Sequence, residues 1–175
     1  MIEFKEFPKI SRLNRGVIIT EKLDGTNACV IVCEDGTVAA QSRSKLITTD
    51  DDNYGFAAWV QKNADDLRTL GPGHHFGEWW GCGIQRGYGL TEKRFSLFNS
   101  HRWETDRPAC CGVVPVLSRW TGFERVAETM DSLRVGGSVA APGFMRPEGI
   151  VVFHTHGQVM FKATIEKDSE WKGKK

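Results

Sequence analysis

The sequence lacks the features that mark several large classes of protein. Its 175 residues contain no apolar stretch long enough to span a membrane. The N-terminus lacks the pattern of a signal peptide, because Lys5, Lys9 and Arg12 interrupt its apolar residues. Cysteine occurs only five times, an odd number, and no two cysteines have the spacing of a zinc ribbon. These absences favour a cytoplasmic protein with free thiols and no membrane partner.

A strong net charge is also missing. The formal charge is +1, so the overall balance does not indicate a nucleic-acid-binding protein. The segments 1–22 and 158–175 each contain five basic and three acidic residues, a composition that is more typical of solvated surface than of a binding site. Apolar residues make up 40% and charged residues 26%, the proportions of an ordinary globular domain with a buried core.

Most of the predicted elements are strands. Runs of β-branched and aromatic residues predict strands at 17–20, 28–34, 37–41, 75–80, 95–98, 113–118, 149–154 and 158–163. A turn at Asp35-Gly36 joins the second strand to the third, and residues 155–157 join the last two as a hairpin. Pro115 places the strand at 113–118 at a sheet edge or a bulge, because proline cannot donate to the ladder.

Two helices are predicted between the strands. The first covers residues 54–70, and the second begins at a capping box, Thr121-Gly122-Phe123-Glu124, and ends at Gly136-Gly137. Each has an apolar stripe at helical spacing, made of Phe56, Val60, Ala64 and Leu67 in the first and of Phe123, Val126, Met130 and Leu133 in the second. We therefore expect one α+β domain of mostly antiparallel sheet with a few helices against it.

Charged residues stand inside or beside otherwise apolar strands. Lys22 follows the first strand in the run Lys22-Leu23-Asp24-Gly25, which alone fits an exposed turn. Glu78 lies in an apolar strand, Glu148 opens another, and Lys162 lies in the last. Because such groups are costly to bury without partners, several of them in one small domain predict that they converge on a common ligand. A triphosphate with its metal would satisfy all of them.

The order of these segments resembles the covalent nucleotidyltransferase superfamily of polynucleotide ligases and mRNA capping enzymes. In that superfamily a K-x-D-G lysine opens the site, a G-E-h-h-G strand and an E-G-h-V-h strand follow, and a lysine-bearing strand closes it. Lys22, Glu78, Glu148 and Lys162 match these motifs in order, and the match spans residues 20–162. The resemblance implies an ATP-grasp-like ligase domain, in which antiparallel sheets flanked by helices surround an ATP groove.

The resemblance implies a chemical role for three residues. Lys22 resembles the nucleophile that attacks ATP and carries AMP as a phosphoramide. An amine attacks phosphorus only when it is unprotonated, and we expect the nearby cations Lys162 and Arg43 to favour that state. Glu148 resembles the carboxylate that positions a divalent metal, Mg²⁺ or Mn²⁺, and Lys162 resembles the contact to the α-phosphate.

Roles in ATP binding follow from the same resemblance. Glu21 resembles the residue whose backbone or side chain contacts adenine N6. Arg43 and Glu78 resemble the pair that hydrogen-bonds the ribose hydroxyls. Phe98 resembles the aromatic residue that stacks on the base, whereas Phe95 would face the other side of its strand.

Asn27 points to the RNA ligase 2 type within the superfamily, because DNA ligases and capping enzymes usually carry arginine at this position. We therefore expect an ATP-dependent RNA ligase acting on RNA ends or nicked duplexes. The sequence departs from the family at the last motif, usually K-x-K, where Met160 or Thr164 replaces the second lysine. Residues 163–175 are too few for a second domain, so we expect no C-terminal OB-fold or helical domain and an accessory protein in its place.

Two alternatives stay open. One is a minimal ATP-dependent DNA nick ligase with the same first step. The other is a non-catalytic module that binds nucleic-acid ends, although the presence of Lys22, Glu78 and Glu148 favours an enzyme. The glycine-rich run at 81–89 does not have the spacing of a dinucleotide-binding loop. We expect a flexible loop there, with Arg86 in reach of phosphate.

Overall fold

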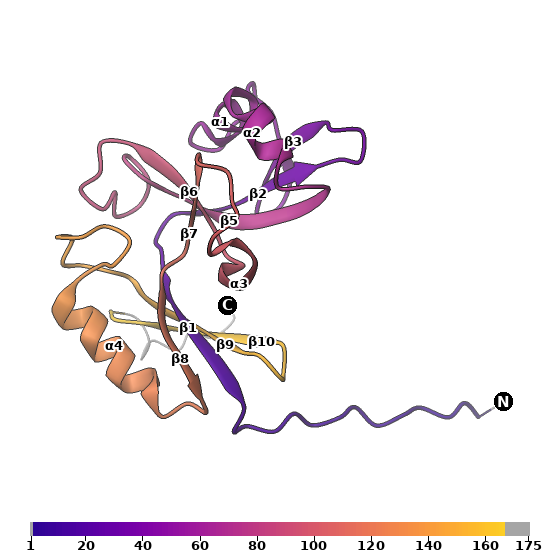
Figure 1. Cartoon of the computed structure of the whole chain (residues 1–175), viewed down its shortest axis with the longest axis vertical. Coiled ribbons are helices and arrows are strands. Elements are labelled where there is room, and N and C mark those ends of the chain that lie inside the picture. Colours follow the sequence, from indigo (N-terminus) through magenta and orange to yellow (C-terminus); the bar gives the residue numbers. More distant parts are fainter. Residues whose placement is uncertain (1, 167–175) are drawn as a thin grey trace, which may run out of the picture.

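The computed structural model describes residues 2–166, which form two β-sheets (Figure 1). The first sheet is antiparallel and has the strand order β10-β9-β1-β8. Its members are β1 (Gly16–Lys22), β8 (Val116–Thr121), β9 (Gly149–His154) and β10 (Val159–Thr164). Strands from both ends of the sequence therefore meet in one sheet, which brings Lys22 beside the start of β9.

The second sheet has the strand order β4-β3-β2-β5-β6-β7 and is antiparallel except where β6 pairs with β7. Its members are β2 (Thr26–Val32), β3 (Val38–Ser42), β4 (Leu46–Ile47), β5 (Gly73–Gly81), β6 (Lys93–Leu97) and β7 (Cys111–Val113). Two mainly antiparallel sheets together with helices that are separate from them confirm the predicted α+β architecture.

Helices cover one face of each sheet (Figure 1). Against the second sheet lie α1 (Phe56–Lys62) and α2 (Ala64–Arg68), and α3 (Ser100–Trp103) joins the same core cluster through Trp103. Helix α4 (Arg125–Gly136) covers the first sheet, with Met130 and Leu133 packed on Val17 and Val152. Side chains alternate across a strand, so the opposite faces of both sheets remain for other uses. Within residues 2–166, no helix has the length and apolar character needed to cross a membrane.

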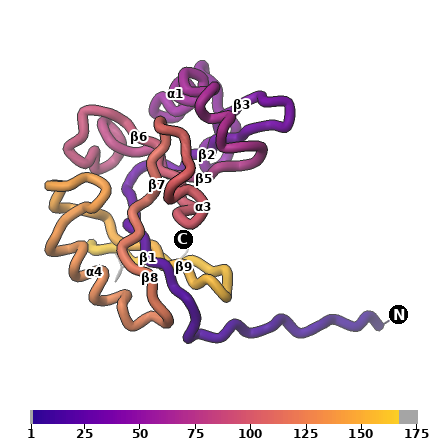
Figure 2. The backbone as a smooth tube through the Cα atoms, viewed as in Figure 1, coloured from indigo at the N-terminus to yellow at the C-terminus, as the bar shows by residue number. Residues whose placement is uncertain are grey.

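The chain crosses from the first sheet to the second between Lys22 and Thr26 (Figure 2). Residues 23–25 belong to neither ladder, so their buried backbone groups need other partners. Leu23 is buried in a third apolar cluster together with Trp80, Tyr88, Val114 and Ala141. This crossing is therefore held by side chains and loops rather than by sheet hydrogen bonds.

Three predicted elements are wrong in detail. The helix at 54–70 is two helices separated at Asn63, whose backbone leaves helical geometry and whose N–H and side chain both donate to Trp59 O. The capping box is absent, because Thr121 ends β8 and α4 begins at Arg125 without a side-chain cap. The strand at 113–118 is divided between the two sheets, since Pro115 interrupts it and its carbonyl accepts the N–H of Glu21.

The N-terminal segment runs away from both sheets (Figure 2). Its large apolar side chains, Ile2, Phe4, Phe7, Ile10 and Leu13, are more than 70% exposed. The segment is attached at its base, where Leu13 O accepts a hydrogen bond from His154 Nε2 at 3.0 Å.

Candidate active site

Lys22 and Glu148 form an ion pair where the first sheet ends. Lys22 is the last residue of β1 and lies opposite Gly149, so the residue just before β9 is its neighbour. The Lys22 Nζ to Glu148 Oε2 distance is 2.6 Å, and the side chains are 23% and 18% exposed. Two residues that are 126 positions apart in the sequence are thus joined at the edge of the interior.

Two motif glycines stand where a side chain would not fit. A Cβ atom on Gly25 would lie 2.4 Å from Trp79 O and 2.8 Å from Trp80 Cβ. A Cβ atom on Gly149 would lie 2.1 Å from Ala163 O, which belongs to the neighbouring strand β10. Both glycines therefore allow a close backbone approach that fixes Lys22 and Glu148 relative to the adjacent strands.

Glu78 ties the second sheet to the crossing. It lies on β5 opposite Asn27 of β2, and its Oε1 accepts the N–H of Gly25 at 3.1 Å. Burial raises the pKa of Glu78 to about 7, although the charge of Lys22 and the bond from Gly25 act to lower it. Glu78 thus contacts the backbone three residues after Lys22, and the charges of Lys22 and Glu148 both act on its pKa.

Asp24 is held by the loop between β5 and β6. Its N–H donates to Tyr88 Oη at 2.7 Å, and its carboxylate accepts from Arg86 Nε at 2.8 Å. Arg86 also donates to Arg146 O and pairs with Glu166 at 3.1 Å. Arg86 is thus bound by two carboxylates and one carbonyl oxygen, and its predicted contact with phosphate stays a prediction.

Sequence reasoning missed Tyr88 altogether. The loop is not loose, since Ile84 and Tyr88 are almost fully buried, and the Tyr88 ring packs against Trp80 and Phe144 at centroid distances of 4.9 and 4.8 Å. The available signal was the presence of two large apolar residues four positions apart within a glycine-rich run.

The side chain of Glu21 points away from Lys22, into the fold. It is 1% exposed, and its carboxylate accepts hydrogen bonds from Ser138 Oγ at 2.6 Å and from the backbone N–H groups of Val139 and Ala140 at 2.9 Å. These three bonds account for its burial without a cationic partner. Of the two ways in which Glu21 was expected to contact adenine, only the backbone remains compatible with this arrangement.

Lys162 lies on the same face of the first sheet as Lys22. Val151 of β9 pairs with Lys162 of β10 on one side and with Thr20 of β1 on the other. Lys162 is therefore level with Thr20, two residues before Lys22, and β9 lies between the strands of the two lysines. Thr164 is opposite Gly149 and hence level with Lys22. Lys162 is exposed and has no ion-pair partner within residues 2–166.

Arg43 and Phe98 follow strands of the second sheet. Arg43 comes just after β3 and is exposed, and Phe98 comes just after β6 and is 41% exposed. Phe95 was expected to face the other side of its strand and is buried in the core cluster of the second sheet. In the part of the chain that the structure describes, no hydrogen bond or ion pair joins either residue to the Lys22–Glu148 pair. Their predicted contacts with a nucleotide stay predictions.

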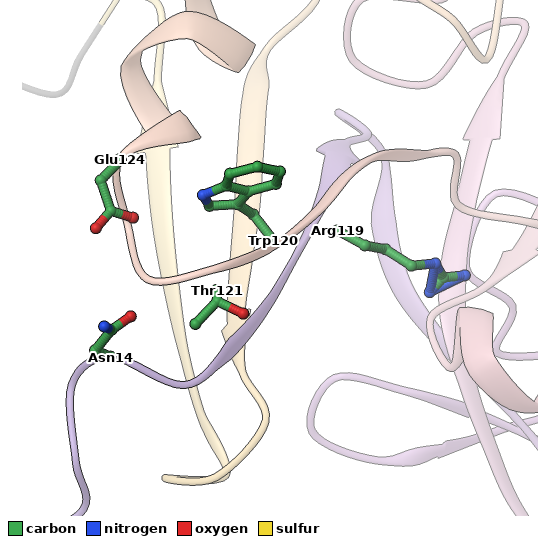
Figure 3. Close-up of a pocket in the computed structure, with 5 residues that line it drawn as sticks. All are labelled: Asn14, Arg119, Trp120, Thr121 and Glu124. Atoms are coloured by element: carbon green, nitrogen blue, oxygen red, sulfur yellow. The ribbon is translucent and has the colours of Figure 1, made fainter.

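Two hollows of the described surface lie at different distances from the Lys22–Glu148 pair. A cavity of about 420 Å³ lies beside the crossing, lined by Asp24, Gln85, Arg86, Arg146 and Glu166. Another, of about 550 Å³, is lined by Asn14, Arg119, Trp120, Thr121 and Glu124 (Figure 3). The residues of β8 that line the second cavity pair with the Gly16 end of β1, which places it at the opposite end of that strand from Lys22. Of these two hollows, the first adjoins the crossing, through Asp24.

A protein-only metal cage is absent from residues 2–166, where no three His, Cys, Asp or Glu side chains are grouped for one ion. Glu148 nevertheless offers an oxygen, since its Oε1 accepts no hydrogen bond from those residues. A carboxylate of this kind fits a hard divalent cation whose other ligands come from phosphate and water.

Comparison with known proteins adds independent information. The family model described as RNA ligase matches residues 15–164. Comparison with the curated proteins finds no match. The family match covers most of the chain and includes every candidate site residue named above.

Solved structures of an RNA ligase from Naegleria gruberi share the fold. A lysine-to-alanine variant with ATP and Mn is 22% identical with a TM-score of 0.65, over 86% of this chain and 49% of that one. A glutamate-to-alanine variant with ATP and Mn is 21% identical with a TM-score of 0.67, over 88% and 51%. The enzyme with PPi is 23% identical with a TM-score of 0.65, over 86% and 50%. The present chain thus spans about half the length of the ligase chains that it matches.

Proposed function

The chain belongs to the RNA ligase family, and we propose that it is an ATP-dependent RNA ligase that carries AMP on Lys22. The observation that carries this proposal is that Lys22 at the end of β1, Glu148 just before β9 and Glu78 on β5 all lie around the crossing between the two sheets. A nucleophilic amine, a half-buried carboxylate and a buried carboxyl group at one crossing are the groups that nucleotidyl transfer requires. Naegleria gruberi RNA ligase, solved with ATP and Mn, shares the fold and supports the choice of ATP and a divalent metal.

In the proposed first step, the Lys22 amine attacks the α-phosphorus of ATP. A bond forms between Nζ and the α-phosphorus, the bond from that phosphorus to the β-phosphate oxygen breaks, and pyrophosphate leaves with the electron pair. Lys22 must be unprotonated, so its ion pair with Glu148 has to open before attack. The exposed cation Lys162, on the same face of the sheet, would meet the α-phosphate and stabilise the charge that develops there.

Glu148 is the residue that would hold the divalent cation, Mg²⁺ or Mn²⁺. Its Oε1 accepts no hydrogen bond from residues 2–166, and phosphate and water would supply the further ligands of the cation. When bound, such a cation supplies positive charge to the phosphates and withdraws electron density from phosphorus.

The nucleotide itself would lie on the faces of the sheets that the helices leave uncovered. We assign the ribose hydroxyls to Glu78 and Arg43, the base to the exposed ring of Phe98, and the adenine N6 contact to the backbone of Glu21. Asn27 lies opposite Glu78 and would complete this part of the site. These assignments rest on the family motifs and on the positions of the residues in the two sheets.

The later steps follow from the covalent intermediate. AMP passes from Lys22 to the 5′-phosphate of an RNA end, and a 3′-hydroxyl then attacks that phosphate and releases AMP. RNA is the proposed strand because the family is that of the RNA ligases and because Asn27 replaces the arginine of DNA ligases. An accessory protein and a cytoplasmic location remain part of this proposal.

The experiment that tests the proposal is incubation with α-labelled ATP, GTP or NAD and with Mg²⁺ or Mn²⁺, followed by a denaturing gel. We expect a labelled protein band with ATP that requires the metal and disappears when pyrophosphate is added in excess. Label from NAD alone, or label without metal, would contradict the proposed cofactors. The absence of any band with a folded protein would favour a non-catalytic end-binding module.

A further inference from the structure

The backbone between Lys22 and Thr26 has an unusual set of partners. It belongs to neither sheet, and the N–H groups of Asp24 and Gly25 donate to the side chains of Tyr88 and Glu78 instead of to a strand. A buried N–H that loses its acceptor costs free energy, so these two side chains determine where the crossing lies. Glu78 already belongs to the proposed site, whereas Tyr88 does not.

Tyr88 is built to hold one position. Its residue is 2% exposed, its ring is fixed between Trp80 and Phe144, and its φ of 54° is that of a left-handed residue. A non-glycine residue in this conformation stores strain, which the surrounding packing must offset. The ring packing leaves the hydroxyl oxygen 2.7 Å from Asp24 N.

Arg86, two residues earlier in the same loop, holds the other end of Asp24. Its side chain is 20% exposed, and its guanidinium joins the Asp24 carboxylate to Glu166, just after β10, and to Arg146 O, just before Glu148. Through Arg86, the loop therefore links Asp24 to the segment after β10, the strand that carries Lys162. It also links Asp24 to the segment just before Glu148. In Figure 1 this loop, between β5 and β6, lies next to the loop that follows α4.

We infer that Tyr88 and Arg86 are positioning residues that fix the crossing and so aim Lys22 at the α-phosphorus. The inference rests on the proposed function, because it assigns these residues to the transfer of AMP to Lys22. Neither residue touches the reacting atoms; both act through Asp24. A displaced nucleophile slows the chemical step more than it weakens the binding of ATP, since its alignment matters only during attack.

The test uses the two tyrosines of the chain as a matched pair. Tyr88→Phe keeps the packed ring and removes only the acceptor of the Asp24 N–H. Tyr54→Phe is the control, because Tyr54 also has a positive φ of 53° but its side chain is half exposed and its hydroxyl makes no hydrogen bond within residues 2–166. Single-turnover formation of labelled protein is measured against ATP concentration, below the melting temperatures of all variants.

We expect Tyr88→Phe to lower the maximal rate at saturating ATP by about tenfold or more while changing the KM for ATP by less than about threefold. The reverse reaction, release of ATP from the labelled protein by pyrophosphate, should slow by the same factor because it passes through the same transition state. Tyr54→Phe should stay within about twofold of the wild type in both directions. A wild-type rate for Tyr88→Phe would overturn the inference.

A second measurement keeps this inference separate from the proposed function. Amide hydrogen exchange at Asp24 and the rate at which acetic anhydride modifies Lys22 both report the crossing without ATP. We expect Tyr88→Phe, but not Tyr54→Phe, to speed Asp24 exchange and to alter the modification of Lys22. If the wild type forms no lysyl-AMP, the proposed function fails while these two readouts still decide whether Tyr88 positions Lys22. Unchanged exchange and modification would refute that role.

Discussion

Replacing Glu78 by glutamine should make the protein more stable at alkaline pH and change it little at acidic pH. The buried carboxyl group of Glu78 lies close to Lys22, Glu148 and Asp24, and its Oε1 accepts the N–H of Gly25. A glutamine oxygen can accept the same hydrogen bond, and its side chain has nearly the same size. The substitution therefore removes the ability to ionise while keeping the contact.

The magnitude follows from the pKa of Glu78, which burial raises from 4.5 to about 7. The folded protein binds this proton more tightly than the unfolded chain, so the free energy of unfolding is highest below the lower value and falls as the pH rises towards 7. At about 1.4 kcal/mol for each pH unit between the two values, ionisation of Glu78 costs the fold roughly 3 kcal/mol at pH 8 and less than about 1 kcal/mol at pH 5. Glutamine does not ionise, so Glu78→Gln does not lose this free energy of unfolding as the pH rises.

The assay is urea unfolding of the wild type and Glu78→Gln at pH 5 and pH 8. We expect the variant to gain roughly 3 kcal/mol over the wild type at pH 8 and less than about 1 kcal/mol at pH 5. Glu34→Gln, in the exposed turn after β2, is the control and should change stability by less than about 0.5 kcal/mol at either pH. A gain that is equal at both pH values, or a loss at pH 8, would refute the claim that Glu78 is held at a charge-disfavouring site.

Three further predictions concern Glu148, the close approach at Gly149 and the preferred strand. Glu148→Ala should abolish metal-dependent labelling while costing about 1–2 kcal/mol, and an unchanged specific activity in the folded fraction would instead indicate a structural role. Gly149→Ala should lower the free energy of unfolding by about 2–4 kcal/mol, because its Cβ would meet Ala163 O. The control Gly136→Ala, at a helical glycine in open space, should raise it by up to about 1 kcal/mol, and similar urea midpoints for the two variants would contradict the close approach at Gly149. Nicked duplexes with ribose at the 3′-hydroxyl side should be sealed faster than matched all-DNA nicks, and equal rates would favour the DNA ligase alternative.

The sequence predicted the strands well where local pattern decides them. The alternating and β-branched run at 149–154 coincides with β9, and Asp35-Gly36 makes the expected turn, with Gly36 at a φ of 81°. Elements that depend on distant partners were predicted less well. Thr121 was expected to cap α4, but its strand pairs with Gly16 more than one hundred residues away and extends β8 to that residue. The pairing of Thr121 with Gly16 extends the strand through the predicted cap, and the local sequence around Thr121 does not reveal that distant partner.

The residues of the candidate site also differ in whether local sequence or distant partners determine their surroundings. Lys22, Glu78 and Glu148 could be singled out because charged residues inside or beside apolar strands are costly to bury, and because their order resembles the motifs of the superfamily. The buried partners of Glu21 could not, since Ser138, Val139 and Ala140 lie in a loop with no motif of its own. Tyr88 was missed for the same reason, because its role depends on a single hydrogen bond across the fold.

The central claim is that Lys22 becomes covalently bound to AMP, and mapping the adduct by mass spectrometry tests it most directly. The wild type and Lys22→Ala are incubated with ATP and Mn²⁺, digested under conditions that preserve a phosphoramide, and searched for an AMP-bearing peptide. The account predicts one modified peptide in the wild type, with AMP on Lys22, and none in Lys22→Ala, which should retain its fold because the residue is partly exposed. AMP on another residue, or an unchanged yield from a folded Lys22→Ala protein, would contradict it.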